Sequence, residues 1–395
     1  MTDKKKSIVF LGFSSFPYGL AEAQKIILIS KALILKENTV TVICRNGLYS
    51  KQEKPELKAE GIYENIRYKY VSGSCFRDKR FFKRRLLELK GRVNEVLFLR
   101  KLAKENKLDY AILSTRNFSS VVLYYALAKM LKFKTILNYV EYYSAAEKNK
   151  FQIKKRINDK LFDKYAPLLS DAVFPISEFL ITHLKKQPSF KPFLKIPVLT
   201  DFSRYQNIEI LRNEKYFLFC GSASYKEIIL FVISSFELIN DSYYLYLVIN
   251  GSENEMQEIQ EYIKMKKKKE KIKIYTKLPQ KELYTYYQNA AALLIPLRST
   301  FQDLARFPHK TGEYLASGNP VISTDYGEVK YYFTNMVNML LAESFDTKLF
   351  ADKMEFVINN PVQAQKIGLE GQKLATKLFD YRSKAQEMNN FLNEI

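Results

Sequence analysis

The chain has 395 residues, of which 47% are hydrophobic and 27% are charged. A chain of this length is expected to form two domains, each with its own core, and this composition excludes an intrinsically disordered protein. The net charge of +21 favours an anionic partner such as nucleic acid, a membrane surface or a charged small substrate, although lysine richness without any function is the alternative.

Cysteine usage and the N-terminal stretch indicate a reducing, cytoplasmic setting. Cys44, Cys75 and Cys220 are odd in number and widely spaced, which fits neither a disulfide framework nor a zinc site. The apolar run at 8–11 is too short for a signal sequence, and no stretch approaches the length of a membrane span. We therefore expect a cytoplasmic protein that neither crosses a membrane nor is exported by this route.

The first half of the chain alternates strand-like and helix-like segments. The apolar runs 7–13 and 39–45 flank a helical pattern at 20–35. Strand, loop, helix and strand in this order open a doubly wound parallel sheet. No G-x-G-x-x-G follows the first run, which disfavours a nicotinamide or flavin site. Further strands are expected at 66–72, 110–114, 134–140 and 172–177.

Segment 77–104 combines an apolar stripe with many cations. The apolar residues that recur there at helical spacing are Phe82, Leu86, Leu89, Val93 and Val96. The basic residues include Lys79, Arg80, Lys83, Arg84, Arg85, Lys90, Arg92, Arg100, Lys101 and Lys104. Such a helix can lie on anionic lipid headgroups, whereas the alternative is a stripe packed on the sheet with its charges in water. Phe76, Phe81 and Phe98 would favour the membrane if they lie off the packed stripe.

Glu141 follows the strand expected at 134–140. Ligands of open α/β sheets bind outside the carboxyl ends of the strands, so Glu141 is the candidate for contacting an acceptor. A loop carboxylate paired with Lys148 or Lys150 is the open alternative.

Residues 306–325 predict a loop, a short helix and a buried strand. Pro308 is expected at the first helical position, where its missing N–H costs nothing. The free amides of His309, Lys310 and Thr311 would then carry the positive end of the helix dipole and could receive a phosphate.

Lys310 and Glu313 are three residues apart and therefore share one face of this helix. The cation suits a phosphate, and the carboxylate suits vicinal hydroxyls such as those of a ribose. A solvated ion pair on an ordinary helix is the alternative interpretation.

This segment resembles the donor-binding signature of the retaining family-4 glycosyltransferases of GT-B fold, in the form F-P-x-K-x-x-E-Y-L-A-x-G-x-P-V. The resemblance implies that Glu313 binds the ribose and that the amides of His309 and Lys310 hold the diphosphate. The first Glu of the family pattern, which touches the donor sugar, would fall at Ala305, so Asp303 is the candidate to replace it.

Loops in both halves extend the resemblance. Gly19 matches the first glycine of a loop that is usually Gly-Gly-Ala-Glu, although Leu20 replaces the second glycine and a plain turn glycine is the alternative. After the strand expected at 216–221, Lys226 matches the diphosphate-binding lysine of the family, but Ser222 stands where the family has an arginine.

Two arginines and one backbone position complete the candidate site. Arg298 and Arg306 lie beside the signature helix and could compensate for the missing arginine, although loop arginines are often only solvated. Leu278 stands where the backbone of the family recognises the nucleobase.

The resemblance covers nearly the whole chain and implies an α/β fold of the GT-B type, with two Rossmann-like parallel-sheet domains facing across a cleft. The expected domains are 1–200, which would bind the acceptor, 201–378, which would bind the nucleotide sugar, and a helix at 379–395 that crosses back to the N-terminal domain. The boundary is placed between Lys195 and Asn213. Strands of the second domain are expected at 216–221, 244–251, 271–276, 291–297, 320–324 and 339–342.

The resemblance implies retaining glycosyl transfer without a metal or other cofactor. We expect a hexosyltransferase that moves a sugar from a UDP- or GDP-sugar to a lipid-linked or saccharide acceptor in bacterial surface polysaccharide synthesis, with no nucleic-acid partner. The expected catalytic residues are Lys226, Lys310, Asp303 and Glu141. The alternatives are a catalytically impaired basic protein that binds nucleic acid or membrane, and a GT-B sugar-nucleotide epimerase.

Overall fold

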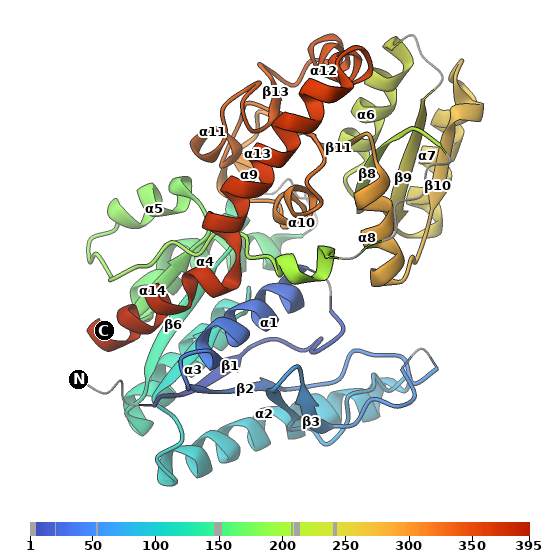
Figure 1. Cartoon of the computed structure of the whole chain (residues 1–395). Coiled ribbons are helices and arrows are strands. Elements are labelled where there is room, and N and C mark those ends of the chain that lie inside the picture. Colours follow the sequence, from blue (N-terminus) through green and yellow to red (C-terminus); the bar gives the residue numbers. More distant parts are fainter. Residues whose placement is uncertain are drawn as a thin grey trace. The chain divides into compact units, whose positions relative to one another are not determined.

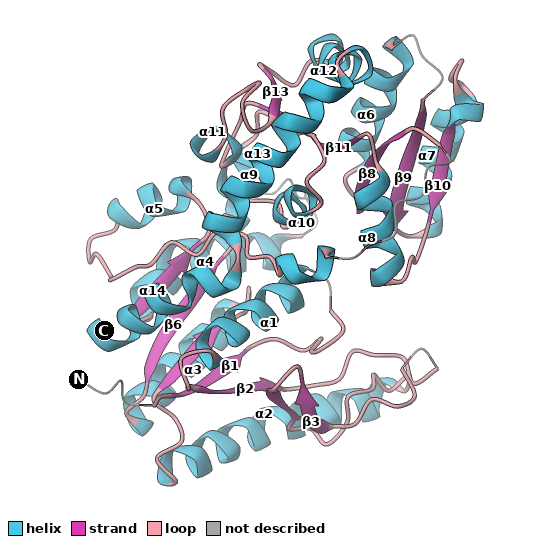
Figure 2. Ribbon diagram, in the orientation of Figure 1, coloured by secondary structure: helices cyan, strands magenta, loops and turns pink. Residues whose placement is uncertain are grey.

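The computed structural model describes residues 5–19, 21–52, 54–145, 152–206, 208, 214–239 and 243–395. The chain forms two compact units, one made of Met1–Leu199 with Tyr381–Ile395 and the other of Thr200–Asp380. Each unit contains a largely parallel sheet with helices packed against it (Figures 1 and 2). The α/β class predicted from the sequence, with two Rossmann-like domains, is confirmed.

The sheet of the first unit has the order β3-β4-β2-β1-β5-β6-β7. Its strands are β1 (Ser7–Leu11), β2 (Thr39–Cys44), β3 (Glu60–Tyr63), β4 (Ile66–Tyr70), β5 (Tyr110–Leu113), β6 (Lys134–Tyr139) and β7 (Ala172–Pro175). All neighbouring strands pair in parallel except β3, which pairs antiparallel with β4. Strand β3 was not expected, because it is a short and mostly exposed edge strand with no apolar alternation.

The helices of the first unit lie on the two faces of its sheet (Figure 1). They are α1 (Ala21–Ile34), α2 (Phe81–Lys104), α3 (Phe118–Leu131), α4 (Ile153–Leu169), α5 (Glu178–Lys185), α14 (Tyr381–Glu394) and the short 3-10 helix η1 (Tyr143–Ala145). Helix α1 contacts α14, whereas α3 contacts both α2 and α4. No helix in the described part of the chain is long and apolar enough to cross a membrane.

The sheet of the second unit is parallel throughout and has the order β10-β9-β8-β11-β12-β13. Its strands are β8 (Tyr216–Ser222), β9 (Tyr244–Asn250), β10 (Ile272–Tyr275), β11 (Ala292–Ile295), β12 (Val321–Thr324) and β13 (Leu340–Ala342). Its helices are α6 (Lys226–Leu238), α7 (Glu253–Lys264), α8 (Gln280–Asn289), α9 (Phe301–Ala305), α10 (Lys310–Ala316), α11 (Val329–Tyr332), α12 (Thr347–Asn359), α13 (Pro361–Phe379), η2 (Phe202–Tyr205) and η3 (Lys269–Lys271).

The C-terminal helix α14 belongs to the core of the first unit, as expected from the sequence. Its buried residues are Tyr381, Ala385, Met388, Asn389, Phe391 and Leu392. The ring of Phe391 lies 5.8 Å from that of Phe174 on β7, and the amide of Asn38 donates to Asn389 Oδ1 at 3.0 Å. The end of the chain is therefore a structural part of the unit that its beginning forms.

We predict that Met388→Ala lowers the free energy of unfolding of the first unit. Met388 is fully buried in its core, so the truncation leaves a cavity and should cost about 2–5 kcal/mol. Calorimetry or denaturant unfolding would measure the change. Gln386→Ala on the exposed side of the same helix is the control, and an equal loss in both variants would contradict the assignment of α14 to the core.

Candidate functional site

The second sheet reverses its strand order on either side of β8. Strand β8 pairs with β9 from Tyr216 to Ser222, but with β11 only at Phe217 and Leu218. The strands β8 and β11 therefore part beyond Leu218, towards their carboxyl ends. The N–H of Cys220 instead donates to Tyr314 Oη of α10 at 2.8 Å. This reversal is the position at which open α/β sheets bind ligands.

Helix α10 begins at Lys310, not at Pro308 as the sequence suggested. The N–H of Thr311 donates to the carbonyl of Pro308 at 3.0 Å, so a tight turn precedes the helix and the Thr311 amide is not free. The Thr311 side chain is fully buried. Among the described residues, the amides of His309 and Lys310 have no backbone acceptor, and their binding of a phosphate stays a prediction.

Glu313 is the centre of a buried ionic cluster, with only 8% of the residue exposed. Lys310 Nζ lies 2.7 Å from its Oε2, His309 Nε2 lies 3.4 Å from its Oε1, and the hydroxyl of Tyr287 donates to Oε2 at 3.5 Å. Burial raises the pKa of Glu313, but Lys310 and His309 outweigh it and hold the pKa well below its usual range. Lys310 and Glu313 therefore form an ionised and mostly buried pair. The alternative interpretation of a solvated surface pair is wrong.

The surroundings of Lys310 also favour the charged form of this ion pair. Burial lowers the pKa of Lys310, but the Glu313 carboxylate, which lies 2.7 Å away, helps to outweigh it, and that pKa is raised above its usual range. The ammonium also lies 5.5 Å from the ring of Tyr287. A cation and a carboxylate are thus both charged and held in place at the carboxyl edge of the sheet.

Asp303 on α9 is fully buried and binds both candidate arginines. Its Oδ2 lies 3.0 Å from Arg298 Nε and accepts from the Arg298 backbone N–H at 2.8 Å, and its Oδ1 lies 2.6 Å from an Arg306 guanidinium nitrogen. Arg298 also pairs with Glu227 on α6 at 2.8 Å. Asp303 therefore positions the two arginines, and its direct contact with a sugar stays a prediction that requires these pairs to open.

Arg306 links α10 to the loop that precedes α6. Its guanidinium lies 4.6 Å from the ring of Tyr225, the residue before Lys226. Ser222, at the end of β8, shares a hydrogen bond of 2.8 Å with the hydroxyl of Ser224. An arginine therefore lies beside the loop in which Ser222 replaces the arginine expected from the resemblance.

Lys226 and Leu278 occupy the same edge of the sheet but make no recorded contact with Glu313 in the described chain. Lys226 is the first residue of α6, and its ammonium pairs with Glu258 of α7 at 2.6 Å. Leu278 lies in the loop between β10 and α8. Their predicted roles in binding a diphosphate and a base stay predictions.

Four tyrosines around this cluster were missed by the sequence reasoning. The rings of Tyr205 and Tyr284 lie 4.7 Å apart, and those of Tyr287 and Tyr314 lie 5.1 Å apart. Tyr284 and Tyr287 share one face of α8, but that spacing is common in any helix packed on a sheet. Only Tyr314 stood inside the recognised signature.

The first unit has its own reversal of strand order, between β1 and β5. At Gly12, which has a φ of 90°, a Cβ would lie 2.7 Å from Thr115 Cβ. At Gly19 a Cβ would lie 2.7 Å from the carbonyl oxygen of Ser15 and 2.8 Å from Ala23 Cβ. Gly19 therefore lets the loop pack against itself and α1, which favours the plain structural role. Leu20 lies outside the described residues.

Glu141 follows β6 and is half-buried at the same edge of the first sheet. Burial raises the pKa of Tyr143, and the charge of Glu141 raises it further. Lys148 and Lys150, the alternative partners of Glu141, lie outside the described residues. The acceptor-binding role of Glu141 stays a prediction.

Lys25 on α1 is a buried cation close to this edge. Only 5% of the residue is exposed, and its ammonium has no hydrogen-bond partner among the described residues. Burial lowers the pKa of Lys25 to about 7, although Glu22 one turn earlier raises it. Sequence reasoning did not single out Lys25, because the helical pattern alone does not say which lysine faces the core.

We predict that Lys25→Met raises the free energy of unfolding by roughly 1–4 kcal/mol at pH 6. The unfolded chain keeps this lysine protonated up to about pH 10, whereas the folded chain releases the proton near pH 7, so the wild type gains stability as the pH rises between these values. The variant lacks that gain, and its advantage should shrink by pH 9. Denaturant unfolding at both pH values, with exposed Lys58→Met as the control, measures it.

We predict that Glu313→Gln lowers the free energy of unfolding of the second unit by about 2–4 kcal/mol at pH 7, because it leaves Lys310 buried without its counter-charge. The low pKa of Glu313 stabilises the fold above about pH 4.5, and this contribution is lost as the pH falls through the folded-state pKa. The difference between the two proteins should therefore shrink at pH 3. Exposed Glu370→Gln is the control, and a pH-independent loss would contradict the ionic account.

Three comparisons place this geometry among known proteins. Residues 203–374 match the family model described as glycosyl transferases group 1. A comparison with curated proteins finds no match. A separate finding concerns metal binding. Among the described residues, no group of three or more histidine, cysteine, aspartate or glutamate side chains could hold a metal ion.

Several solved structures share the architecture over almost the whole chain. A sucrose-phosphate synthase from Thermosynechococcus elongatus has a TM-score of 0.76 at 14% identity, with 99% of each chain covered. HepE from Anabaena, in complex with UDP-glucose, has a TM-score of 0.71 at 13% identity and covers 99% of this chain and 100% of its own. TarM from S. aureus, in complex with UDP among other ligands, has a TM-score of 0.66 at 10% identity, covering 99% and 100%. At such identities the likeness shows the fold, and the predicted GT-B class is confirmed.

Proposed function

We propose that the chain transfers a glycosyl group from a nucleotide sugar, because residues 203–374 match the family model described as glycosyl transferases group 1. The observation that supports this proposal best is the cluster of Glu313, Lys310 and His309 at the strand-order reversal of the second sheet. An ionised carboxylate in that position suits the vicinal hydroxyls of a ribose. The neighbouring cation and the free amides of His309 and Lys310 suit a diphosphate.

The proposed chemistry depends on the leaving group. As the glycosidic bond breaks, the sugar gains oxocarbenium character and the departing diphosphate gains negative charge. Fixed N–H groups and cations at the diphosphate stabilise that charge without further reorganisation. We assign this role to the amides of His309 and Lys310 and to the Lys310 ammonium. Lys226 would join them after exchanging its partner Glu258 for a phosphate oxygen.

Arg306 is the proposed substitute for the arginine that Ser222 lacks. Its guanidinium lies over Tyr225 beside the Ser222 loop, and Asp303 holds it there. Arg298 binds the other oxygen of the same Asp303 carboxylate and so helps to hold that carboxylate in position. Direct contact of Asp303 with the donor sugar would require the release of one of these arginines.

The finer assignments are proposals that rest on the resemblance. They are retention of the anomeric configuration, transfer of a hexose without a bound metal, and a saccharide or lipid-linked acceptor of a bacterial surface glycan, with Glu141 contacting the acceptor. Uridine is the first base to test, because the HepE structures contain UDP and UDP-glucose.

We predict that the protein binds UDP or GDP and that Glu313→Ala weakens this binding about 10–100-fold, because a charge-assisted hydrogen bond to the ribose is lost. Calorimetric titration with UDP, GDP, ADP and CDP measures the affinities. Glu261→Ala is the matched control, since Glu261 is exposed in the second half of α7, away from the carboxyl edge of the sheet.

Product analysis then separates the possible reactions. Incubation with nucleotide sugars and a bacterial lipid extract should release nucleoside diphosphate only when an acceptor is present, and the anomeric configuration can be read by NMR. Sugar altered without an acceptor would indicate an epimerase. No affinity for any nucleoside diphosphate, together with salt-sensitive binding of nucleic acid, would refute the transferase proposal.

A further inference from the structure

Helix α2 is attached to the first unit through a polar inner face. A Cβ at Gly91 would lie 2.5 Å from the Arg45 carbonyl oxygen, so the helix touches the chain after β2 at this point. Asn94 donates to the Val71 carbonyl at 2.8 Å, and the buried Glu95 pairs with Arg45 at 2.7 Å. These contacts fix the rotation of the helix about its own axis.

The opposite face of α2 carries an uncovered apolar stripe. Its side chains are strongly exposed: Phe82 86%, Leu86 66%, Leu89 60%, Val93 52% and Leu97 55%. At about 100° per residue these five positions lie within about 80° of arc, roughly opposite Gly91. The interpretation that the predicted stripe packs on the sheet is therefore wrong, because the inner face is formed by other residues.

The three phenylalanines that the sequence analysis named around this helix differ in their exposure. Phe81 is 53% exposed beside the start of the stripe, whereas Phe76 packs against the core and Phe98 is half-buried. Val96, which was expected in the stripe, is also half-buried. The exposed apolar stripe thus runs from Phe82 to Leu97 along one side of the helix, with the ring of Phe81 in contact with that of Phe82 at its start.

Cations flank this stripe on both sides. By helical geometry Lys83, Lys90 and Lys101 lie along one border, and Arg85 and Arg92 lie along the other. Of the two carboxylates in α2, Glu95 faces inward and Glu88 is paired with Arg85 at 2.8 Å. The outer face of α2 therefore has a strong positive charge around an apolar centre.

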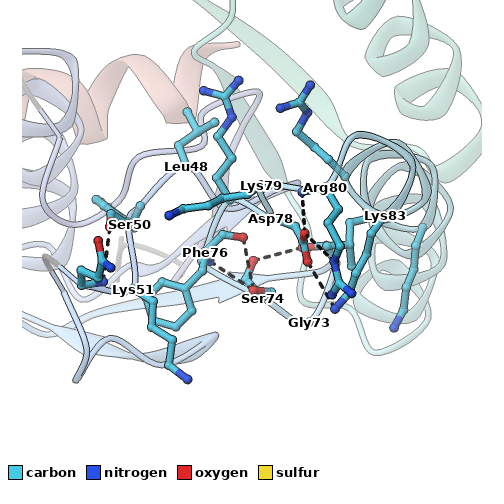
Figure 3. A pocket seen from close by; sticks show the side chains of 17 residues that line it. Leu48, Ser50, Lys51, Gly73, Ser74, Phe76, Asp78, Lys79, Arg80 and Lys83 are labelled. Atoms are coloured by element: carbon cyan, nitrogen blue, oxygen red, sulfur yellow. Dashed lines mark hydrogen bonds and ion pairs between the residues drawn. The ribbon is translucent and has the colours of Figure 1, made fainter.

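A basic hollow of about 1080 Å³ adjoins the start of α2 (Figure 3). It is formed by the loops that follow β2 and β4 and by the first turns of the helix. The cations that line it between residues 77 and 90 are Arg77, Lys79, Arg80, Lys83, Arg84 and Lys90. Its one lining carboxylate, Asp78, is paired with Arg80 at 3.4 Å and Lys83 at 3.2 Å. Within the described chain no ion pair is recorded for the other four cations.

We propose that the outer face of α2 and the basic hollow together form a docking surface for an anionic lipid bilayer. The stripe matches the boundary between acyl chains and headgroups, where a helix lies in the plane of the membrane. The flanking lysines and arginines are long enough to reach lipid phosphates while their stems stay against the apolar layer. Lys83 and Lys90 border the stripe and also line the hollow, so the two surfaces adjoin one another there.

The composition of this face argues against other partners. In a two-fold symmetric dimer the same patch would meet itself, which would bring the rows of cations together. Nucleic acid matches the charge, but it offers no apolar layer to cover five exposed aliphatic and aromatic side chains. An anionic bilayer matches both the charge and the stripe.

The basic hollow lies at the edge of the first sheet where open α/β sheets bind ligands. The loops after β2 and β4 lie at the carboxyl ends of parallel strands of the first sheet, the same edge as Gly19 and Glu141. A docked α2 would therefore hold that edge at the lipid surface. The proposal does not depend on the transfer reaction, because lipid binding can be measured without a nucleotide sugar.

The first test uses vesicles of phosphatidylcholine with and without phosphatidylglycerol. The full-length protein should cosediment with the anionic vesicles at least about tenfold more tightly, with a binding constant that falls as salt rises. Replacing Lys79 and Lys90, which are both exposed and line the hollow, by serine should weaken binding about fivefold per cation. Lys366 and Lys377, which are exposed on α13, give the matched charge control.

The second test addresses the stripe. Phe82→Ser combined with Leu86→Ser should weaken vesicle binding by about tenfold or more without lowering the melting temperature, since both side chains are exposed. Val362→Ser with Leu369→Ser on α13 is the matched control, because these side chains are 71% and 43% exposed.

The chain contains no tryptophan, which permits a direct report of immersion. Leu86→Trp should show a blue-shifted emission on addition of anionic vesicles and quenching by brominated lipids, whereas Val362→Trp should show neither. Equal binding to neutral and anionic vesicles, or no change in the double serine variant, would overturn the proposal. The proposal would also be overturned if the wild type formed a dimer and the stripe variant did not. Salt-sensitive binding of nucleic acid without any binding of vesicles would overturn it as well.

Discussion

The candidate site depends on the reversal of strand order around β8. Strands β8 and β11 stay paired only as far as Leu218, and the amide of Cys220 then donates to the hydroxyl of Tyr314. This bond fixes α10 at the point where the sheet opens. Because the rigid sheet positions α10, the short helix can hold a charged cluster that its own few turns would not stabilise.

Charge compensation distinguishes the two surfaces proposed to bind ligands. In the second unit every cation assigned to a diphosphate has a carboxylate partner: Lys310 has Glu313, Lys226 has Glu258, and both arginines share Asp303. A phosphate would therefore exchange partners with groups that are already positioned. On α2 and its hollow, cations exceed carboxylates, so an anionic partner would be attracted from a distance.

Local patterns predicted most of the elements that carry this site. The buried strands β6, β8 and β12 are short apolar runs beside turn residues, and they lie within one or two residues of their expected positions. Lys310 and Glu313 share a side of α10 because helical spacing requires it. The start of α10 was misplaced at Pro308, because the preference of proline for a first helical position does not exclude a tight turn before the helix.

The sequence by itself determined the two doubly wound domains, the signature segment around Glu313 and the presence of an apolar stripe on a basic helix. Only the tertiary structure decided that Glu313 is buried with two cations, that Asp303 restrains Arg298 and Arg306, and that the stripe of α2 faces outward. Periodicity fixes which residues share a face of a helix. The face that turns inward is fixed by contacts between distant residues, such as the Arg45–Glu95 pair, which no local pattern contains.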